Sequence, residues 1–316
     1  MKIVILDRST LGEDTPFDKI EKLGSVFYYE SSANDDVIID RIADADVIIV
    51  NKVKITREII KNAHKLKLIC VFATGYDNID ISAAREFSVG VCNVPGYSTE
   101  SVTLFTVATV LSLVTHLREY NNHVISGEYS CGTSANRLTP VYNEIYGKTW
   151  GIIGYGNIGR AVGRVAEALG ARVIVNKRNE DKGCECVSIE ELCRRSDIIT
   201  IHCPLNDESR NLINKDRIAV MKKDVVIVNE ARGAVVNEYD VTDAIKKGMI
   251  GAFGSDVYSS EPFSTDHPFY EIKDFSNVLF TPHAAWGSYE SRLRCIGIIC
   301  ENIDSYLVGD KKNRVD

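Results

Sequence analysis

The sequence lacks several features of membrane, secreted and repetitive proteins. No apolar run reaches the roughly 18 residues that a membrane-spanning helix requires, so we expect no membrane partner. The amino terminus is too short and, at Asp7, too soon acidic for a signal peptide, and it predicts a first strand instead. Asn-x-Ser/Thr acceptors, tandem repeats and low-complexity segments are absent as well. No regulatory domain follows Asp316, so feedback through such a domain is not expected.

Positive charge is also in short supply. Lys and Arg total 37 against 44 Asp and Glu, which gives a net charge of −7 and a pI near 5.5. A mildly acidic chain offers no electrostatic surface for nucleic acid, although a few well-placed cations could bind a small anion. With 316 residues, 45% of them hydrophobic and 26% charged, the chain is expected to form about two globular domains.

The cysteines indicate a reducing compartment. There are nine, an odd number, and several lie inside apolar runs, as expected for small buried thiols in a cytoplasmic protein. Cys184, Cys186 and Cys193 are close in sequence, but their spacing does not fit a closed zinc site and no His is near them. We therefore predict a cytoplasmic protein with no metal.

Short apolar segments alternate with amphipathic ones along the whole chain. This rhythm is typical of βαβ units, in which parallel strands are covered by helices on both faces. The predicted strands form two series, so we expect two doubly wound sheets in an α/β fold. The first series comprises residues 2–6, 26–29, 47–50, 68–72 and 90–92. The second comprises residues 150–153, 172–175, 198–201, 225–228, 251–255 and 278–280.

Two long segments complete the predicted domain organisation. Apolar residues recur at helical spacing over 99–122, which predicts one continuous helix. Gly, Ser, Asn and Pro cluster in 127–144, which predicts a loop. A final helix over 288–307 has no sheet of its own beside it, so we expect the chain to cross back to the first domain. The predicted domains are 1–97 with 285–316, and 98–284.

A glycine-rich loop follows the first strand of the second series. In G-x-G-x-x-G after a strand and before a helix, Gly154 permits the tight turn and Gly156 lets the backbone approach a pyrophosphate. Gly159 allows close packing of helix and strand, and the helix N-terminus faces the anion. The alternative is a glycine turn without a ligand, but the context favours dinucleotide binding. The predicted cradle comprises Gly154, Tyr155, Gly156, Asn157, Ile158 and Gly159.

The end of the next strand bears on the choice of dinucleotide. An NAD site usually has an acidic residue there to hold the ribose hydroxyls. This chain has Lys177 and Arg178, and no carboxylate occurs before Glu180. Two cations would attract a 2′-phosphate, so NADP is the preferred cofactor and NAD stays possible. The alternative interpretation is a solvated basic end of a loop.

Three further strands of this series are followed by loops with reactive side chains. They carry Arg232, Glu261 and His283, and ligands of open α/β sheets bind at these loops. Reduction of a 2-oxo acid needs such a set: a planar cation for the carboxylate and a general acid for the ketone oxygen. Arg232 could supply the first and His283 the second, with Glu261 favouring the protonated imidazole. Each residue alone could be structural.

These residues resemble the D-isomer-specific 2-hydroxyacid dehydrogenase family over nearly the whole chain. The matching stretches are ATGYDNID at 73–80, NVPGYST at 93–99, the glycine loop, HCPL at 202–205, NEARG at 229–233, DVYSSEP at 256–262, and Pro282 and His283 followed by Trp286. The resemblance implies two Rossmann-like domains, with 1–97 and 285–316 as the substrate domain and 98–284 as the dinucleotide domain.

The same resemblance implies roles for individual residues. Arg232, Glu261 and His283 would be catalytic, and backbone N–H groups at Thr74 and Gly75 would hold the substrate carboxylate. The resemblance also places Asp256 beside the nicotinamide amide and makes the helix after Thr99 the contact of a homodimer. Cys203 and Ala231 would line the cofactor cleft.

Two positions depart from the family pattern. Lys177 replaces the usual Asp, which resembles NADP-using glyoxylate and hydroxypyruvate reductases. Glu230 is unusual beside the cofactor, and its negative charge could offset part of the effect of Lys177.

Tyr97 and Trp286 bear on the substrate. Tyr97 matches a substrate-contacting Tyr of D-lactate dehydrogenase-like members, and Trp286 resembles glycerate dehydrogenase-type members. A Trp wall would favour a short substituent, so hydroxypyruvate and glyoxylate are expected before pyruvate, although Trp286 could simply pack under the last helix.

Other classes remain open on the sequence alone. A non-enzymatic, nucleotide-sensing protein similar to C-terminal-binding-protein corepressors would keep the same residues, but basic or disordered tails are missing here. A methyltransferase that binds S-adenosylmethionine would leave Arg232, Glu261 and His283 without a role.

Overall fold

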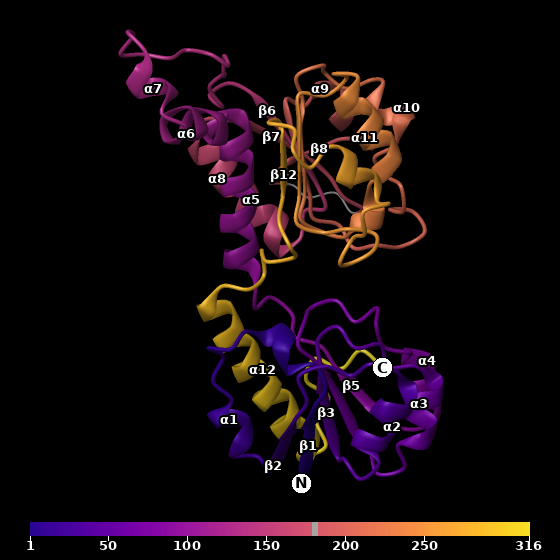
Figure 1. Cartoon of the computed structure of the whole chain (residues 1–316). Coiled ribbons are helices and arrows are strands. Elements are labelled where there is room, and N and C mark those ends of the chain that lie inside the picture. The colour runs from indigo at the N-terminus through magenta and orange to yellow at the C-terminus, as the bar shows by residue number, and fades with distance from the viewer. Residues whose placement is uncertain (179–182) are drawn as a thin grey trace. The chain divides into compact units, whose positions relative to one another are not determined.

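The chain folds into two compact units, each built around a parallel sheet. A computed structural model describes residues 1–178 and 183–316 (Figure 1). One unit contains Met1–Ser98 and Gly287–Asp316, and the other contains Thr99–Trp286. The sheets have five and seven strands, all paired in parallel, with helices on both faces. The predicted α/β fold with two Rossmann-like sheets is confirmed.

The first unit has the strand order β2-β1-β3-β4-β5. Strands β3 (Val47–Val50) and β4 (Leu68–Val71) are buried at every residue, as expected for continuous apolar runs covered on both faces. The other strands are β1 (Lys2–Ile5), β2 (Ser25–Tyr28) and β5 (Gly90–Cys92).

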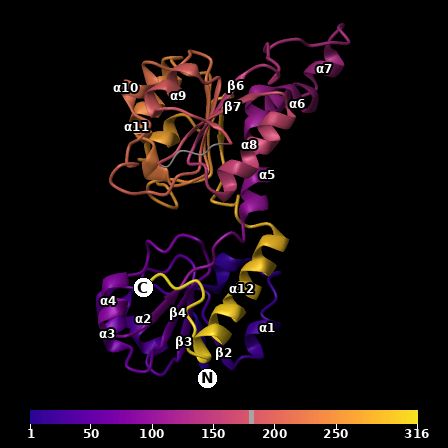
Figure 2. The same ribbon diagram turned by 180° about the vertical axis from the view of Figure 1, so that it is seen from behind.

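Helices cover both faces of this first sheet. On one face, α2 (Asp35–Ile42), α3 (Arg57–Asn62) and α4 (Ile81–Glu86) bury their apolar residues against the strands. Each starts at a side chain that accepts a hydrogen bond from a backbone N–H of the first turn, which fixes the helix start. On the other face, α12 (Tyr289–Leu307) packs against β4 and α1 (Asp18–Glu21) (Figure 2). A 3₁₀ turn, Arg8–Leu11, follows β1.

The second unit has the strand order β12-β11-β10-β9-β6-β7-β8. The strands are β6 (Thr149–Ile153), β7 (Arg172–Asn176), β8 (Glu185–Cys186), β9 (Ile198–Ile201), β10 (Val226–Asn229), β11 (Ala252–Ser255) and β12 (Val278–Phe280). The order reverses at β6, which has β7 on one side and β9 on the other. Open α/β sheets bind their ligands at such a switch point.

An apolar core lies on each face of this second sheet. Helices α5 (Thr99–Val114) and α8 (Asn157–Ala168) pack on one face. The opposite face is covered by α9 (Ile189–Arg195), α10 (Lys215–Ile218) and α11 (Glu238–Lys246).

The segment after α5 differs from the sequence prediction. The predicted continuous helix 99–122 breaks after Val114, and α6 (Leu117–Ile125) starts from His116, whose φ of 53° lies in the left-handed region. A short helix, α7 (Glu128–Cys131), lies inside the predicted loop. Within the described residues no single helix is long and apolar enough to cross a membrane; the α5–α6 pair, bent by 66°, passes by length and composition only.

Candidate active site

The glycine loop forms a cradle that excludes side chains. Gly154 has a φ of +88°, and a Cβ there would lie 2.5 Å from the backbone nitrogen of Cys203. At Gly159 a Cβ would lie 2.2 Å from the carbonyl oxygen of Gly154, so helix and loop touch through backbone alone. Gly156 is the N-cap of α8 and faces open space. The first turn of α8 has no acidic residue, so its N–H groups suit an anion such as a pyrophosphate.

The other cradle residues surround these glycines. The ring of Tyr155 lies under the guanidinium of Arg160, 5.0 Å from ring centroid to Cζ. Its hydroxyl would lie 3.1 Å from a Cβ at Gly163, so the ring covers the first turns of α8. Asn157 is exposed, and Ile158 packs against the core beneath α8.

The two cations at the end of β7 lie on the other side of the glycine loop from β9. Arg178 Nη2 lies 2.6 Å from Glu208 Oε2, and both side chains are more than 70% exposed (73% and 77%). An ion pair this exposed contributes little stability, so an incoming phosphate can compete for the guanidinium. Glu180 lies outside the described residues.

The predicted acid–base residues meet at the ends of β11 and β12. Glu261 Oε2 lies 2.6 Å from His283 Nδ1, and the two side chains are 28% and 25% exposed. Glu261 Oε1 also accepts a hydrogen bond from the backbone N–H of Tyr258 at 3.1 Å, which fixes the carboxylate. His283 has a φ of 52°, and its backbone N–H donates to the carbonyl of Asp256. The imidazole is therefore held by its ring nitrogen and by its backbone.

Arg232 follows β10 in extended backbone (φ −145°) before a 3₁₀ turn, Gly233–Val235. Its Nη1 donates to the carbonyl of Ala231 at 2.8 Å, and its own carbonyl accepts from the side chain of Asn229 at 2.9 Å. A Cβ at Gly233 would lie only 1.9 Å from the carbonyl carbon of Tyr258. The Arg232 turn thus rests directly on the loop that carries Glu261.

Sequence reasoning missed a network that holds this loop. Glu238, at the start of α11, accepts hydrogen bonds from the backbone N–H of Ser259 at 2.8 Å and from the Ser259 hydroxyl. Its Oε2 also lies 2.9 Å from Nε2 of His267, and both side chains are 7% exposed. Successive N–H groups of the loop, Tyr258 and Ser259, are therefore bound by the carboxylates of Glu261 and Glu238. An acidic residue beginning a helix is the only signal that the sequence offers.

Asp256 anchors the turn that carries His283. Its carboxylate accepts hydrogen bonds from the Thr281 hydroxyl at 2.7 Å and from the N–H groups of Ala284 and Ala285 at 2.8 and 2.9 Å. Nearby, burial raises the pKa of the Cys203 thiol to about 11, so it stays a neutral thiol. Ala231 is buried, and its N–H donates to the side chain of Asn229.

The predicted substrate-binding residues are divided between the units. Thr74 and Gly75 follow β4 of the first unit, where the Thr74 hydroxyl donates to the carbonyl of Val94 at 2.9 Å. The Tyr97 carbonyl accepts from Arg294 Nε at 2.9 Å. Trp286 belongs to the second unit and is partly buried.

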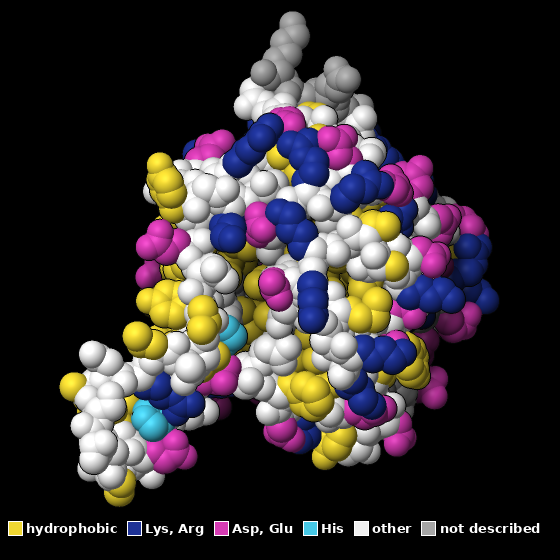
Figure 3. Space-filling model, turned by 90° about the horizontal axis from the view of Figure 1, so that it is seen from above, with side chains coloured by type: hydrophobic (Ala, Val, Ile, Leu, Met, Phe, Trp, Pro, Cys, Tyr) yellow, Lys and Arg dark blue, Asp and Glu magenta, His cyan; other side chains and the backbone are white. Residues whose placement is uncertain are grey.

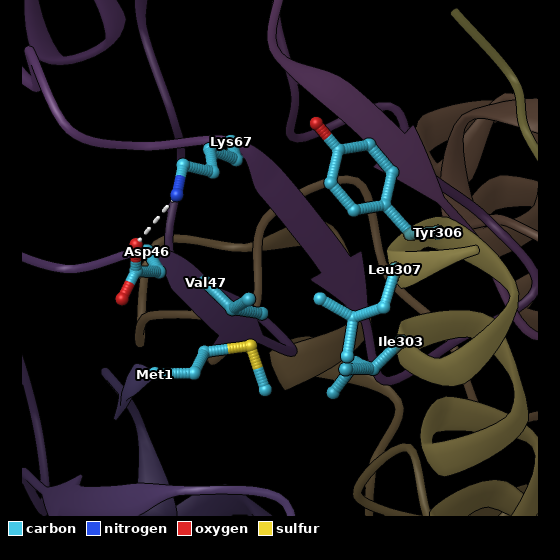
Figure 4. A pocket seen from close by; sticks show the side chains of 7 residues that line it. All are labelled: Met1, Asp46, Val47, Lys67, Ile303, Tyr306 and Leu307. Atoms are coloured by element: carbon cyan, nitrogen blue, oxygen red, sulfur yellow. Dashed lines mark hydrogen bonds and ion pairs between the residues drawn. The ribbon is translucent and has the colours of Figure 1, made fainter. Parts of the chain in front are cut away.

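A separate hollow of about 260 Å³ lies in the first unit, at the opposite end of its strands (Figure 4). Its lining is mostly apolar, and the ion pair of Lys67 Nζ and Asp46 Oδ1, 3.0 Å apart, lies at one side. The lining residues are Met1, Asp46, Val47, Lys67, Ile303, Tyr306 and Leu307. Because ligands of open α/β sheets bind at the carboxyl ends of strands, this hollow is not the predicted site. Among the described residues no group of three or more His, Cys, Asp and Glu could hold a metal ion.

Comparison with known proteins decides the family. The model of the D-isomer specific 2-hydroxyacid dehydrogenase NAD binding domain matches residues 107–285. The chain belongs to this family. The hydroxypyruvate reductase of Blautia hydrogenotrophica is 36% identical over 324 residues, and the match covers 100% of both chains.

Solved structures agree with this assignment. An acyclic imino acid reductase in complex with NADPH and D-arginine has a TM-score of 0.89 at 30% identity, with 100% of both chains covered. The D-lactate dehydrogenase from Aquifex aeolicus complexed with NAD and lactic acid has a TM-score of 0.87 at 28% identity, covering 100% of this chain and 99% of that one. The 2-hydroxyacid dehydrogenase resemblance is thus confirmed: the chain is an NAD(P)-dependent oxidoreductase that interconverts 2-oxo acids and D-2-hydroxy acids.

Proposed function

We propose that this dehydrogenase reduces a short 2-oxo acid, hydroxypyruvate or glyoxylate, with NADPH. The contact of His283 with Glu261 carries the proposal, because it supplies an oriented acid for a ketone oxygen. The name of the Blautia hydrogenotrophica relative, hydroxypyruvate reductase, supports the substrate class. Trp286 next to this loop supports a pocket for a small substituent.

The proposed mechanism assigns a task to each residue. The cofactor, when bound, supplies the hydride. Glu261 holds Nδ1 of His283, so that Nε2 is the nitrogen that gives its proton to the ketone oxygen as negative charge develops there. Arg232 grips the substrate carboxylate with its planar fork, assisted by backbone N–H groups at Thr74 and Gly75. Tyr97 and Trp286 would bound the substituent.

We further propose a division of labour between the domains. Residues 98–284 would bind the dinucleotide, with the pyrophosphate on the cradle 154–159 and the nicotinamide end near Cys203, Ala231 and Asp256. Residues 1–97 and 285–316 would bind the substrate. The excluded Cβ positions at Gly154 and Gly159 support the first assignment, because the loop packs on its neighbours through backbone alone, while the open space at Gly156 leaves room for a pyrophosphate.

The preference for NADP is a proposal that rests on Lys177 and Arg178. The exposed guanidinium of Arg178 follows β7, where a ribose would lie. Changing Lys177→Asp together with Arg178→Ala is expected to shift the ratio of kcat/KM values toward NADH by at least tenfold, because a carboxylate repels the 2′-phosphate and accepts from ribose hydroxyls. A wild type that already prefers NADH would contradict the proposal.

A homodimer in a reducing cytoplasm completes the proposal. Large apolar side chains are exposed along the segment after Thr99. Figure 3 shows apolar side chains on the part of this segment that protrudes at lower left. They include Leu104 (71% exposed), Ile125 (72%), Leu138 (78%) and Val141 (74%), and burying them against a second copy would be favourable. None of the nine cysteines, all in the described part of the chain, forms a disulfide, which fits a reducing compartment.

A substrate panel tests the proposed function. Purified protein is mixed with NADPH or NADH and with hydroxypyruvate, glyoxylate or pyruvate, and oxidation of the nicotinamide is followed by absorbance. The expected result is the highest kcat/KM with NADPH and hydroxypyruvate or glyoxylate. Turnover of pyruvate alone would instead assign a D-lactate dehydrogenase activity. No turnover with any of these acids would overturn the proposal.

A further inference from the structure

Glu230 is a buried carboxyl group that the acid–base mechanism does not use. It follows β10 directly and is only 9% exposed. Within the described residues neither of its oxygens has a partner at full hydrogen-bond geometry, and the hydroxyl of Thr109 on α5 is a weak one. Burial and the neighbouring Asp256 raise the pKa of Glu230 well above its usual range. Ionising a buried carboxyl group that has so few donors is costly. A nearby positive charge would therefore favour its ionisation.

The strand register places Glu230 in a row of polar groups. Ile153 of β6 pairs with Ile201 of β9, which pairs with Asn229 of β10. Asn229 pairs in turn with Ser255 of β11. The residue after each of these lies at the carboxyl edge of the sheet. The row is Gly154, His202, Glu230 and Asp256.

This row lies where the nicotinamide end of a dinucleotide would be. The pyrophosphate cradle is at β6, and the cations proposed for the adenosine end follow β7 on one side of it. A dinucleotide that crosses the switch point therefore extends its other half over β9, β10 and β11. Alternation along β10 puts Glu230 on the α5 side, because Val228 packs in the core under α5 and Ile227 in the opposite core. Glu230 thus lies on the α5 side of the carboxyl edge over which the proposed ring would extend.

The neighbouring polar groups of this edge are either neutral or bound by donors. Burial lowers the pKa of His202 to about 3, so its imidazole is neutral. Asp256 is stabilised by three donors. The Tyr258 hydroxyl, which donates to the carbonyl of Thr281, has its pKa raised by burial and stays protonated. Glu230 is left as the group in this set whose protonation can follow the charge of a ligand.

We propose that Glu230 senses the redox state of the bound cofactor, an inference that rests on the proposed nicotinamide site. The reduced ring is neutral, and Glu230 keeps its proton beside it. The oxidised ring is a cation, and Glu230 ionises beside it by releasing one proton to solvent, with no electron transferred. The carboxylate then stabilises NADP⁺ over NADPH at the site, which favours the hydroxy-acid side of the bound equilibrium and retains the oxidised cofactor as pH rises.

Proton-linked binding tests this inference. Both cofactor forms are titrated into wild-type protein, with affinity read from tryptophan fluorescence and protons counted with an indicator dye in weak buffer. NADP⁺ is expected to release up to one proton that NADPH does not, and its affinity to rise by up to about tenfold per pH unit while Glu230 ionises. NADPH carries the same 2′-phosphate, so the difference between the two titrations removes the contribution of that group. NAD⁺ and NADH are run in parallel.

Glu230→Gln keeps the shape but cannot ionise, and it is expected to abolish the difference in proton release while NADPH affinity changes less than about threefold. Glu167→Gln, at an exposed carboxylate on α8, is the matched control and should keep the wild-type difference. Equal proton release by both cofactor forms in the wild type would overturn the inference without any variant. An unchanged difference in proton release in Glu230→Gln would overturn it as well. Failure of both dinucleotides to bind would instead overturn the proposed cofactor site and the inference with it.

Discussion

Two buried carboxyl groups, one at the carboxyl edge of each sheet, have opposite surroundings. Asp7 follows β1 of the first unit and is 3% exposed, while Glu230 follows β10 of the second and is 9% exposed. Asp7 accepts hydrogen bonds from the backbone N–H groups of Asn51, Lys52 and Val53 at 2.6–3.0 Å. Glu230 accepts none at full geometry. Burial raises the pKa of both, but the N–H groups oppose the rise in Asp7.

The difference teaches that the position at a carboxyl edge does not by itself define a role. Asp7 is fully engaged in closing the loop after β3, so it serves the fold. Glu230 stores a proton that a cationic ligand can release. The catalytic pair lies between these extremes, because His283 and Glu261 are bonded to each other yet stay partly exposed.

The largest effect expected from the chemistry of the second sheet is that of His283→Ala. Loss of the general acid should lower kcat by about 10²–10⁴ while cofactor binding is retained. Steady-state kinetics and a fluorescence titration measure both. His64→Ala, at an exposed histidine of the first unit, is the control. Wild-type turnover in His283→Ala would remove this residue from the acid role.

Asp7→Asn should show the opposite pattern in the first sheet. An amide cannot accept from all three N–H groups, and each buried donor left unpaired costs about 1–3 kcal/mol, so a loss of roughly 2–4 kcal/mol in unfolding free energy is expected. Chemical denaturation measures it, with Asp36→Asn at an exposed position as the control. A loss of turnover at unchanged stability would mean that Asp7 belongs to the site and that the comparison is wrong.

The sequence predicts the sheets well because buried parallel strands are uninterrupted apolar runs. All strands of both sheets except β8 were expected from such runs, and β8, with two residues, is too short to give a pattern. The break at His116 was not foreseen, since apolar spacing continues across it and a left-handed residue is set by tertiary contacts.

Side-chain partners were harder to foresee than strands. Ser259 and His267 bind a glutamate 21 and 29 residues away, and no local pattern encodes that distance. The sequence singled out Glu230 as a charge beside the cofactor, but only coordinates show how few donors surround it.

Glu238→Gln tests whether a carboxylate whose oxygens are all hydrogen-bonded within the fold still contributes to catalysis. Its single amide oxygen cannot replace both carboxylate oxygens, so either the Ser259 N–H or the donors at Oε2 lose their acceptor, and the loop carrying Glu261 should loosen. We expect kcat to fall about tenfold, equivalent to about 1.4 kcal/mol. The alkaline limb of the pH profile of kcat/KM for reduction should also be displaced, because reduction needs the protonated imidazole, which Glu261 orients less well. A purely structural role would lower stability and leave that pH profile in place.

Glu230→Gln should produce the smallest change at pH 5, and one that grows as pH rises. A carboxyl group whose pKa is raised by folding contributes its full stability below the unfolded pKa and loses it as pH rises toward the folded value. The wild type should therefore lose stability between pH 5 and pH 8 through this group, and the variant should not. The cost of burying the amide does not depend on pH and cancels in this comparison, so the variant should gain about 1.4 kcal/mol for each pH unit over which Glu230 is ionised in the unfolded chain but not in the folded one. Parallel pH dependence of unfolding in both proteins would show that Glu230 finds a donor in solution, which would make it the counterpart of Asp7 rather than its contrast.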